Sequence, residues 1–136
     1  MRTAKDFTAR DKFCQFNAME VISVDKGRAR TSMEIKPHHL NGLGIVHGGA
    51  VFTLADLAFA AASNSGEDAV VSTNASITYL KAATAGILFA EAKEIARSRK
   101  LATYDIQVTN EAGELLAVML GTGYIKSKTV HVTNSH

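Results

Sequence analysis

The residues best suited to do chemistry lie in a glycine-rich stretch and in the apolar run that follows it. Four of the ten glycines fall between Gly42 and Gly49, so the backbone there can come close to a ligand. The residues from Ala50 to Ala62 favour a helix, because no glycine or proline interrupts them. The first turn of a helix leaves N–H groups unpaired and carries partial positive charge. This junction therefore suits a polarised carbonyl or a developing oxyanion.

Asp56 is the one charged residue of this predicted helix. An almost wholly apolar helix is normally buried, and a buried carboxylate without a partner costs several kcal/mol. We therefore expect Asp56 to have a partner or a function. The alternative is a narrow stripe of residues that faces water, spaced three or four apart: Gly49, Thr53, Asp56, Ala60 and Ser63. The polar residues Asn41 and His47 in the preceding loop favour the functional interpretation.

The pattern Asn41-x-x-Gly44-x-x-His47-Gly48-Gly49, with an acid nine residues after the histidine, resembles the hotdog-fold acyl-CoA thioesterases of the PaaI-like branch, named after phenylacetic acid degradation. The resemblance extends over roughly residues 10 to 126. It implies an α+β fold in which an antiparallel β-sheet wraps around one long central helix. It also implies hydrolysis of an acyl-CoA thioester to a free acid and CoA, with no metal or redox cofactor.

Five residues of this stretch are candidates for the site. The Gly48 N–H is the candidate donor to the thioester oxygen, since it lies at the positive end of the helix. Asn41 could orient the attacking water or hold the thioester group. His47 either shapes the loop and hydrogen-bonds near the site or is a purely structural histidine, and Gly49 is expected to contact substrate. Asp56 is the candidate general base or carboxylate nucleophile, and the sequence leaves these two roles open.

Two further groups are candidate substrate contacts. In related proteins a polar residue on the strand after the helix helps to place the nucleophile, which corresponds here to Thr73 or Asn74. Strand alternation lets only one of them face the site, and we prefer Asn74, although both could be ordinary strand residues. Arg97, Arg99 and Lys100 form the densest basic cluster, at a turn between two strands. This cluster is either a solvated turn or, as the resemblance favours, a contact for the phosphates of CoA.

The rest of the chain predicts the elements that position these residues. The 136 residues suit a single domain. We expect a short amphipathic helix over about residues 6–16, with Phe13 and Phe16 as core residues, and a hairpin from Met19 to Ile35. After the long helix, strands are predicted over about 69–80, 87–97, 101–109 and 115–125, and residues 127–136 read as a polar tail.

One helix covers only one face of such a sheet, so a second subunit should bury the other face or the open edge. The resemblance adds a dimer of dimers, that is, a homotetramer. It also places the site between two protomers, so that Asn41, His47 and Gly48 of one would face Asp56 of the other.

The composition excludes several functional classes. A net charge of +2 is too small to indicate nucleic-acid binding, although it favours a small anionic substrate. The longest apolar run is interrupted by polar residues and falls short of a membrane span, and the N-terminus lacks the apolar core of a signal peptide. We therefore expect a cytoplasmic protein. The single cysteine, Cys14, excludes an internal disulfide and is expected to be an inert packed thiol.

Alternative functions stay open at this point. His38, His39 and His47 suggest a metal site only weakly, because no second ligand cluster accompanies them and His131 and His136 lie in the tail. A hotdog dehydratase or hydratase would also act on acyl thioesters, and a non-catalytic acyl-CoA sensor would share most of the sequence. The spacing of Asn41 and Asp56 disfavours the first, and the presence of Asp56 disfavours the second.

The acyl group is the least constrained part of the prediction. Within the family, arylacetyl or hydroxylated aryl groups are expected, and short or medium aliphatic chains are not excluded. The pocket would draw on aromatic residues whose orientation the sequence does not define: Phe16, Phe52, Phe59 and Tyr79.

Overall fold

The computed structural model describes residues 3–126. Two short helices open the chain, α1 (Ala4–Arg10) and α2 (Lys12–Phe16), and strands β1 (Met19–Asp25) and β2 (Arg28–Glu34) follow as a hairpin. A 3₁₀ turn, η1 (Pro37–His39), then leads to the long helix α3 (Gly48–Ser63). Four strands complete the described chain: β3 (Ala69–Tyr79), β4 (Ile87–Arg97), β5 (Leu101–Asn110) and β6 (Leu115–Lys126). The predicted tail, residues 127–136, lies outside the described residues.

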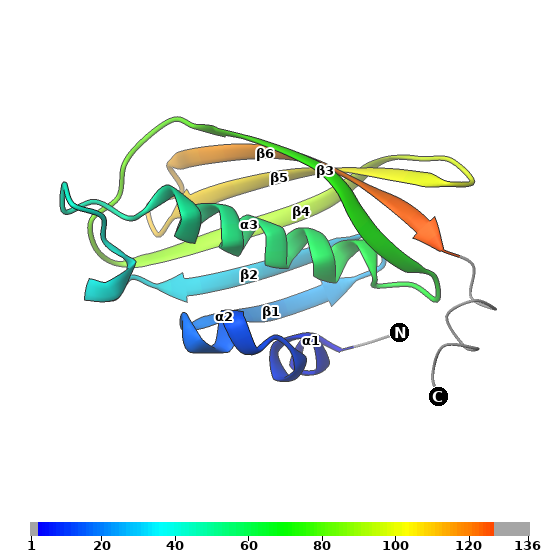
Figure 1. Ribbon diagram of the computed structural model, residues 1–136, viewed down its shortest axis with the longest axis horizontal. Helices are drawn as coiled ribbons and strands as arrows, with labels where there is room; N and C mark the ends of the chain where they lie inside the picture. Colours follow the sequence, from blue (N-terminus) through cyan, green and yellow to red (C-terminus); the bar gives the residue numbers. More distant parts are fainter. Residues whose placement is uncertain (1–2, 127–136) are drawn as a thin grey trace.

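All six strands join one antiparallel sheet in the order β1-β2-β4-β5-β6-β3, so that β1 and β3 form its edges. The sheet curves around α3, which lies across its concave face, and α1 and α2 flank the helix beside β1 (Figure 1). The predicted α+β architecture of a sheet wrapped around one long helix is therefore confirmed.

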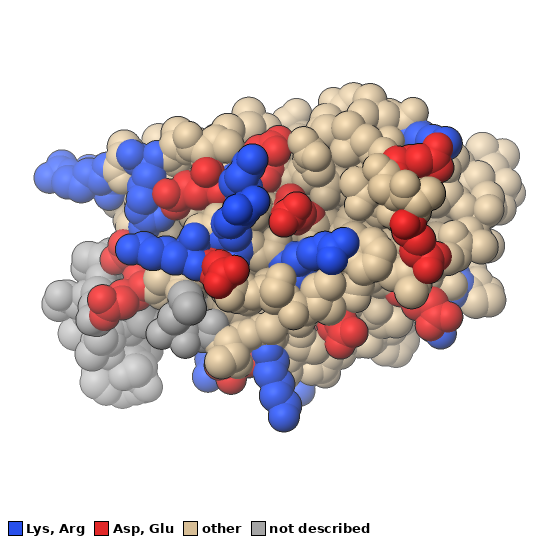
Figure 2. Space-filling view, turned by 180° about the vertical axis from the view of Figure 1, so that it is seen from behind, with Lys and Arg blue, Asp and Glu red and all other residues tan. Residues whose placement is uncertain are grey.

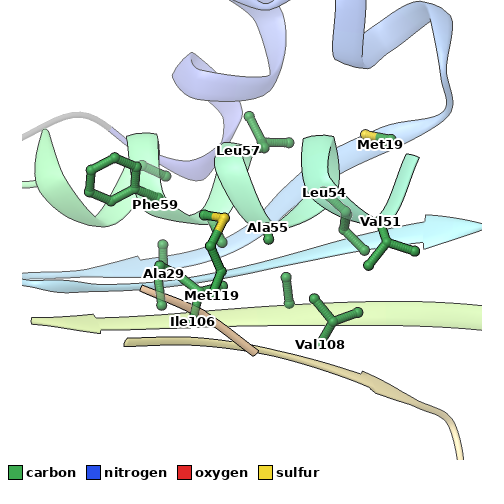
Figure 3. Packing of buried hydrophobic residues seen from close by; sticks show 14 of the residues in the cluster. Met19, Ala29, Val51, Leu54, Ala55, Leu57, Phe59, Ile106, Val108 and Met119 are labelled. Carbon is green, nitrogen blue, oxygen red and sulfur yellow. The ribbon is translucent and has the colours of Figure 1, made fainter. Parts of the chain in front are cut away.

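Helix α3 is held to the sheet by small and branched side chains. Val51, Leu54 and Ala55 point toward the sheet, where Val108 and Met119 meet them (Figure 3). Alanines at further buried positions of the helix allow the close approach of helix and sheet: Ala58, Ala61 and Ala62. The helix is therefore packed closely against the sheet along its buried side.

Glycines on β6 make room for the one large aromatic residue that α3 directs at the sheet. A Cβ atom at Gly121 would lie 3.3 Å from the ring of Phe59, and one at Gly123 would lie 2.4 Å from a methyl group of Val70. The Phe59 ring also packs against Tyr104, with 5.5 Å between the ring centroids. Gly121 therefore lets the Phe59 ring of α3 lie close to β6, and Gly123 lets the Val70 side chain of β3 lie against β6.

The N-terminal segment differs from the prediction of one helix over residues 6–16. Asp11 is extended, with φ −94° and ψ 93°, and its side chain accepts a hydrogen bond from the Cys14 N–H at 2.9 Å. Asp11 thereby ends α1 and caps α2, because an aspartate satisfies the free N–H groups of a helix start. The single predicted helix is thus two.

Phe13 and Phe16 are not core residues, so that expectation was wrong. They are 64% and 84% exposed, whereas Cys14 between them is 4% exposed and packs in the core. A helix as short as α2 buries one side only, and Cys14 occupies that side. Burial raises the pKa of the Cys14 thiol to about 12, which keeps it protonated and unreactive near neutral pH.

The outer face of the sheet, on the side away from α3, carries charges of both signs (Figure 2). Arg30 pairs in register with Glu91, and Lys93 pairs with Asp105. Opposite charges directly across two strands attract each other, so these pairs partly neutralise the charge of the outer face. No helix within residues 3–126 is long and apolar enough to span a membrane.

Candidate active site

The loop before α3 folds back on itself, and Asn41 holds it together. The Asn41 side-chain oxygen accepts hydrogen bonds from the N–H groups of Leu43, at 2.9 Å, and Ile45, at 3.3 Å. Gly44 adopts φ +77°, a conformation that favours glycine. The Asn41 oxygen is thus committed to the loop, while its NH₂ group has no partner among residues 3–126 and can donate to a ligand.

His47 caps α3 and so orients its first turn. Its backbone is extended, with φ −60° and ψ 135°, and its Nδ1 accepts a hydrogen bond from the Gly49 N–H at 2.8 Å. The Gly49 N–H is therefore occupied, and the predicted contact of Gly49 with substrate would have to use other atoms. The hydrogen bond from Gly49 is what is expected of a histidine that shapes the loop.

Gly48, the first residue of α3, has an N–H with no acceptor in the described part of the chain. Its carbonyl oxygen accepts a hydrogen bond from the Tyr79 hydroxyl at 2.9 Å. A Cβ atom at this position would lie 3.1 Å from the Tyr79 Cζ and hydroxyl oxygen. Gly48 therefore leaves a free N–H at the positive end of the helix while Tyr79 fixes the turn behind it.

The contact of Tyr79 with Gly48 was not predicted from the sequence. Tyr79 is the last residue of β3, and its pairing with Ala117 of β6 sets the side on which its ring lies. The sequence indicated Tyr79 only as a possible pocket residue. An aromatic residue at a strand end carries no signal that it will contact a glycine 31 positions earlier.

Asp56 lies on the half-buried side of α3, well away from Gly48 of the same chain. Eight residues of helix correspond to about 12 Å along the axis. Burial, and then the negative charge of Asp11, raise the pKa of the Asp56 carboxyl above its ordinary value. Within residues 3–126 this carboxylate makes no hydrogen bond or ion pair, so it remains free to act as a base.

The structure also bears on the alternative in which Asp56 belongs to a stripe that faces water. Gly49 at the start of that stripe is exposed, but Thr53, Asp56 and Ala60 are half-buried. Ser63 at its end is buried, and its hydroxyl donates to the Ala60 carbonyl at 3.3 Å. In the single chain this side of the helix is thus only partly open to water.

Thr73 and Asn74 lie at a β-bulge of the edge strand β3, where the register with β6 shifts between Ser72 and Asn74. The Thr73 hydroxyl donates to the Thr122 carbonyl at 3.1 Å. Ala75 packs against the core, so alternation turns its neighbour Asn74 to the outer side of the strand. Asn74 therefore faces away from α3 of its own chain, and its contact with the site stays a prediction.

The basic turn lies at the other end of α3. Arg97 Nη1 donates to Glu94 at 2.9 Å and Nη2 donates to Asp68 at 3.1 Å, so the Arg97 side chain is already paired. Arg99 and Lys100 are exposed and form no ion pair in the described part of the chain. A cavity of about 960 Å³ adjoins the turn, and both Arg97 and the end of α3 line it. The predicted cluster is thus divided, with two of its three cations available.

Two of the three histidines that suggested a metal site, His39 and His47, have ring nitrogens that hydrogen-bond to backbone groups. Both ring nitrogens of His39 contact backbone groups, Nδ1 the Lys36 N–H and Nε2 the Asn17 carbonyl oxygen. The Nδ1 atom of His47 is likewise occupied. Across residues 3–126, no group of three or more His, Cys, Asp or Glu side chains is placed to hold a metal ion. His131 and His136 lie outside the described residues.

Comparison with known proteins identifies the family. The model of the thioesterase superfamily matches residues 43–117, which include both Gly48 and Asp56. The chain belongs to this superfamily. Among curated relatives, a putative esterase of Archaeoglobus fulgidus is 44% identical over 115 residues, covering 84% of this chain and 75% of that one.

A second relative supports both the branch of the family and the activity. The acyl-coenzyme A thioesterase PaaI of Escherichia coli K12 is 35% identical over 107 residues, covering 78% of this chain and 76% of its own. A solved structure of E. coli PaaI, described as from the phenylacetic acid degradation operon, superposes with a TM-score of 0.87 at 31% identity and covers 92% of this chain and 91% of that one. The predicted PaaI-like family is confirmed, and so is the prediction of a thioester hydrolase.

One solved structure of a similar protein contains a ligand. The smu.793 protein of Streptococcus mutans UA159, bound to acetyl-CoA, superposes with a TM-score of 0.77 at 27% identity, covering 82% of this thioesterase and 91% of the other chain.

Proposed function

We propose that this thioesterase hydrolyses an aryl- or arylacetyl-CoA ester to the free acid and CoA, at a site that two protomers share. The named activity of E. coli PaaI and its place in a phenylacetic acid degradation operon support this substrate class. The acetyl-CoA bound to the S. mutans relative supports CoA as the thiol part. Short and medium aliphatic acyl groups are the competing substrates.

The free N–H of Gly48 is the observation that carries the proposal. A thioester oxygen placed at this N–H would gain a hydrogen bond and the positive end of α3 as negative charge develops on it. The NH₂ group of Asn41, which the loop leaves free, is a second donor for the thioester or for the attacking water. His47 holds the turn that presents both groups.

Asp56 supplies the basic group. A raised pKa makes this carboxylate a stronger base near neutral pH than an ordinary aspartate. As a general base it takes a proton from water while the water oxygen attacks the acyl carbon, and the C–S bond then breaks to release CoA. As a nucleophile it attacks the acyl carbon, and the C–S bond breaks to release the CoA thiolate and leave an anhydride. Water then hydrolyses the anhydride to the free acid and the Asp56 carboxylate, and the proton released goes to the thiolate. Both routes need no metal or other cofactor.

The separation of Gly48 and Asp56 supports a shared site. About 12 Å of helix between them exceeds the reach of two groups that must act on one acyl carbon. Two antiparallel copies of α3 would bring Gly48 of one protomer to Asp56 of its partner. Edge strand β3 offers the surface for such pairing, because the backbone groups along its free side have no partner strand within residues 3–126.

The higher assembly is part of the same proposal. Val71, Tyr124 and Leu101 stand in register on the outer face of three neighbouring strands, and each is exposed. An apolar row of this kind suits the contact between two dimers, giving a homotetramer. In the same proposal, Arg99 and Lys100 bind the phosphates of CoA. The protein is proposed to act in the cytoplasm.

The first experiment is release of free thiol from a panel of aromatic and aliphatic acyl-CoA esters by the wild type and Asp56→Asn. The proposal expects the highest kcat/KM with an aryl or arylacetyl ester and a loss of at least about a hundredfold in the variant. A preference for aliphatic esters would reassign the substrate, and full activity of Asp56→Asn would remove Asp56 from the mechanism.

Subunit exchange tests the shared site. Gly48→Ala and Asp56→Asn, which alone should lose at least about tenfold and about a hundredfold of the activity, should together regain about a quarter of the wild-type rate after mixing, because half of the dimers are then mixed and each has one intact site. A site within one chain would recover no activity.

The oligomeric state is tested separately. Light scattering after size exclusion measures the mass of the assembly, and a monomer would refute the proposed dimer and tetramer.

A further inference from the structure

His39 is a buried histidine for which the proposed mechanism has no use. The residue is 2% exposed, and both ring nitrogens meet backbone groups. The Lys36 N–H lies 2.9 Å from Nδ1, and the Asn17 carbonyl oxygen lies 2.8 Å from Nε2. The ring thus joins the end of α2 to the start of the η1 turn.

These two partners define the protonation state of the ring. A backbone N–H can only donate, so Nδ1 must carry no proton, and a carbonyl oxygen can only accept, so Nε2 must carry one. The ring is therefore neutral. Burial lowers the pKa of His39, the nearby His38 and Lys36 act in the same direction, and the hydrogen bond to Asn17 opposes them.

The backbone of His39 continues this connection to the active-site turn. Its carbonyl oxygen accepts a hydrogen bond from the His47 N–H at 2.7 Å. Leu40 and Val46 form a bridge just inside this pair, and the Val46 N–H donates to the Ala83 carbonyl at 2.8 Å. His39 therefore stands at the base of the loop that carries Asn41 and His47.

We propose that His39 is a positioning residue of the thioesterase site, whose neutral ring clamps the base of the catalytic loop to α2. It touches no substrate and acts through the loop. A proton on Nδ1 would face the Lys36 N–H and break the clamp, so acid would release the loop. His38 and Lys36 are the titratable groups whose charges act on the ring, and α2 contributes the Asn17 carbonyl. This inference rests on the proposed role of Asn41, His47 and Gly48.

Kinetics of matched variants test the clamp. His39→Asn keeps an acceptor near Nδ1, His39→Gln keeps a donor near Nε2, His39→Ala keeps neither, and the exposed His38→Gln is the control. We expect His39→Ala to lower kcat by about tenfold or more with KM changed by less than about twofold, because misplaced groups slow chemistry more than binding. The kcat values of His39→Asn and His39→Gln should lie between those of His39→Ala and the wild type. These two variants provide the test if His39→Ala fails to fold.

Nuclear magnetic resonance tests the same inference without reference to activity. As the pH of the folded wild type is lowered, the amide resonances of His47 and Gly48 should shift with the midpoint of the His39 ring. In His39→Asn the part of these shifts that follows the His39 midpoint should vanish. If protonation of His39 leaves both amides unmoved, or if His39→Ala is less stable yet matches the kcat of His38→Gln, the positioning role is refuted. A wild type without thioesterase activity would refute the proposed function, while the resonance experiment would still decide whether the clamp exists.

Discussion

The Tyr79 hydroxyl donates a hydrogen bond to the Gly48 carbonyl oxygen at 2.9 Å, which joins the end of edge strand β3 to the first turn of α3. A Cβ atom at Gly48 would crowd the same ring, since Cζ and the hydroxyl oxygen would lie 3.1 Å from it and the ring or the turn would have to shift by a few tenths of an ångström. The group proposed to stabilise the oxyanion is thus held by a residue that lies 31 positions later in the chain. Strand β3 would also be the strand that meets the partner, so dimer formation and the catalytic turn are physically connected.

A methyl group at Gly48 should therefore damage the site through Tyr79. Gly48→Ala is expected to lower kcat/KM by at least about tenfold, because the turn must shift to relieve the contact and a displaced oxyanion donor loses much of its effect. Tyr79→Ala should restore part of the loss in the double variant. Tyr79→Phe, which removes the hydroxyl but keeps Cζ 3.1 Å from the added Cβ, should restore less than Tyr79→Ala does. Equal recovery with both Tyr79 variants would show that the contact is not the cause.

Asp56 should make the folded protein less stable at neutral pH. Because its pKa is raised in the folded chain, the folded state binds a proton at this carboxyl more readily than the unfolded state does. Its contribution to stability is therefore fully favourable at acidic pH and is lost as the pH rises through the raised pKa. Asp56→Asn should have a higher free energy of unfolding than the wild type at pH 7, with a difference that shrinks toward pH 4. Urea unfolding at several pH values measures it, and a difference independent of pH would exclude ionisation of Asp56 as the cause.

Asp11 should set part of the acid limit of activity. Its negative charge disfavours ionisation of Asp56, so Asp11→Asn lowers the Asp56 pKa and should move the acid limb of kcat/KM to lower pH. Asparagine can still cap α2 through the Cys14 N–H, so the helix should persist. Asp105→Asn, on the outer face, is the control. An unmoved limb in Asp11→Asn would mean that this charge does not act on the catalytic base.

The parts of the fold that were predictable from sequence are those with a strong local pattern. The glycine-to-helix junction at Gly48, the apolar run of α3 and the alternating strands each carry a signal within a dozen residues. The break at Asp11 is a different case, because an aspartate side chain that captures a nearby N–H competes with a continuous helix. The amphipathic pattern of residues 6–16 gives no sign of that competition. The same pattern led to the wrong prediction that Phe13 and Phe16 lie in the core.

The arrangement of the site was less predictable, because it depends on contacts between distant elements. The loop bonds of Asn41 and the cap of His47 are local, but the contact of Tyr79 with Gly48 follows from strand pairing across the sheet. The bulge that turns Asn74 outward is likewise a matter of register. Arg97 looked equivalent to Arg99 in the sequence, yet only the fold brings Glu94 and Asp68 to it.

Alanine at the two β6 glycines should have unequal costs. A Cβ at Gly123 would lie 2.4 Å from Val70 and 3.2 Å from the Val71 carbonyl oxygen, so strand β3 itself would have to move. A Cβ at Gly121 would lie 3.3 Å from a single ring, that of Phe59, which can shift slightly. We expect about 2 to 3 kcal/mol of destabilisation for Gly123→Ala and about 1 kcal/mol for Gly121→Ala, in the range of overpacked cores. Thermal and urea unfolding measure both, and a reversed order would contradict this packing.

The basic turn should separate into binding and structural residues. Arg99 and Lys100 are exposed and unpaired within residues 3–126, so Arg99→Ala with Lys100→Ala should raise KM for an acyl-CoA several-fold while kcat stays near the wild-type value. The rise should diminish at high salt, since screened charges attract phosphate less. Arg97 is held by Glu94 and Asp68 beside the end of α3, so Arg97→Ala should instead lower the unfolding midpoint with a smaller effect on KM. An acyl ester of a thiol that lacks the nucleotide is the control substrate, because its KM should respond to neither change. If Arg97→Ala raised the KM for acyl-CoA more than the double variant did, the ion pairs of Arg97 would have to open for CoA to bind, and Arg97 would belong with the binding residues.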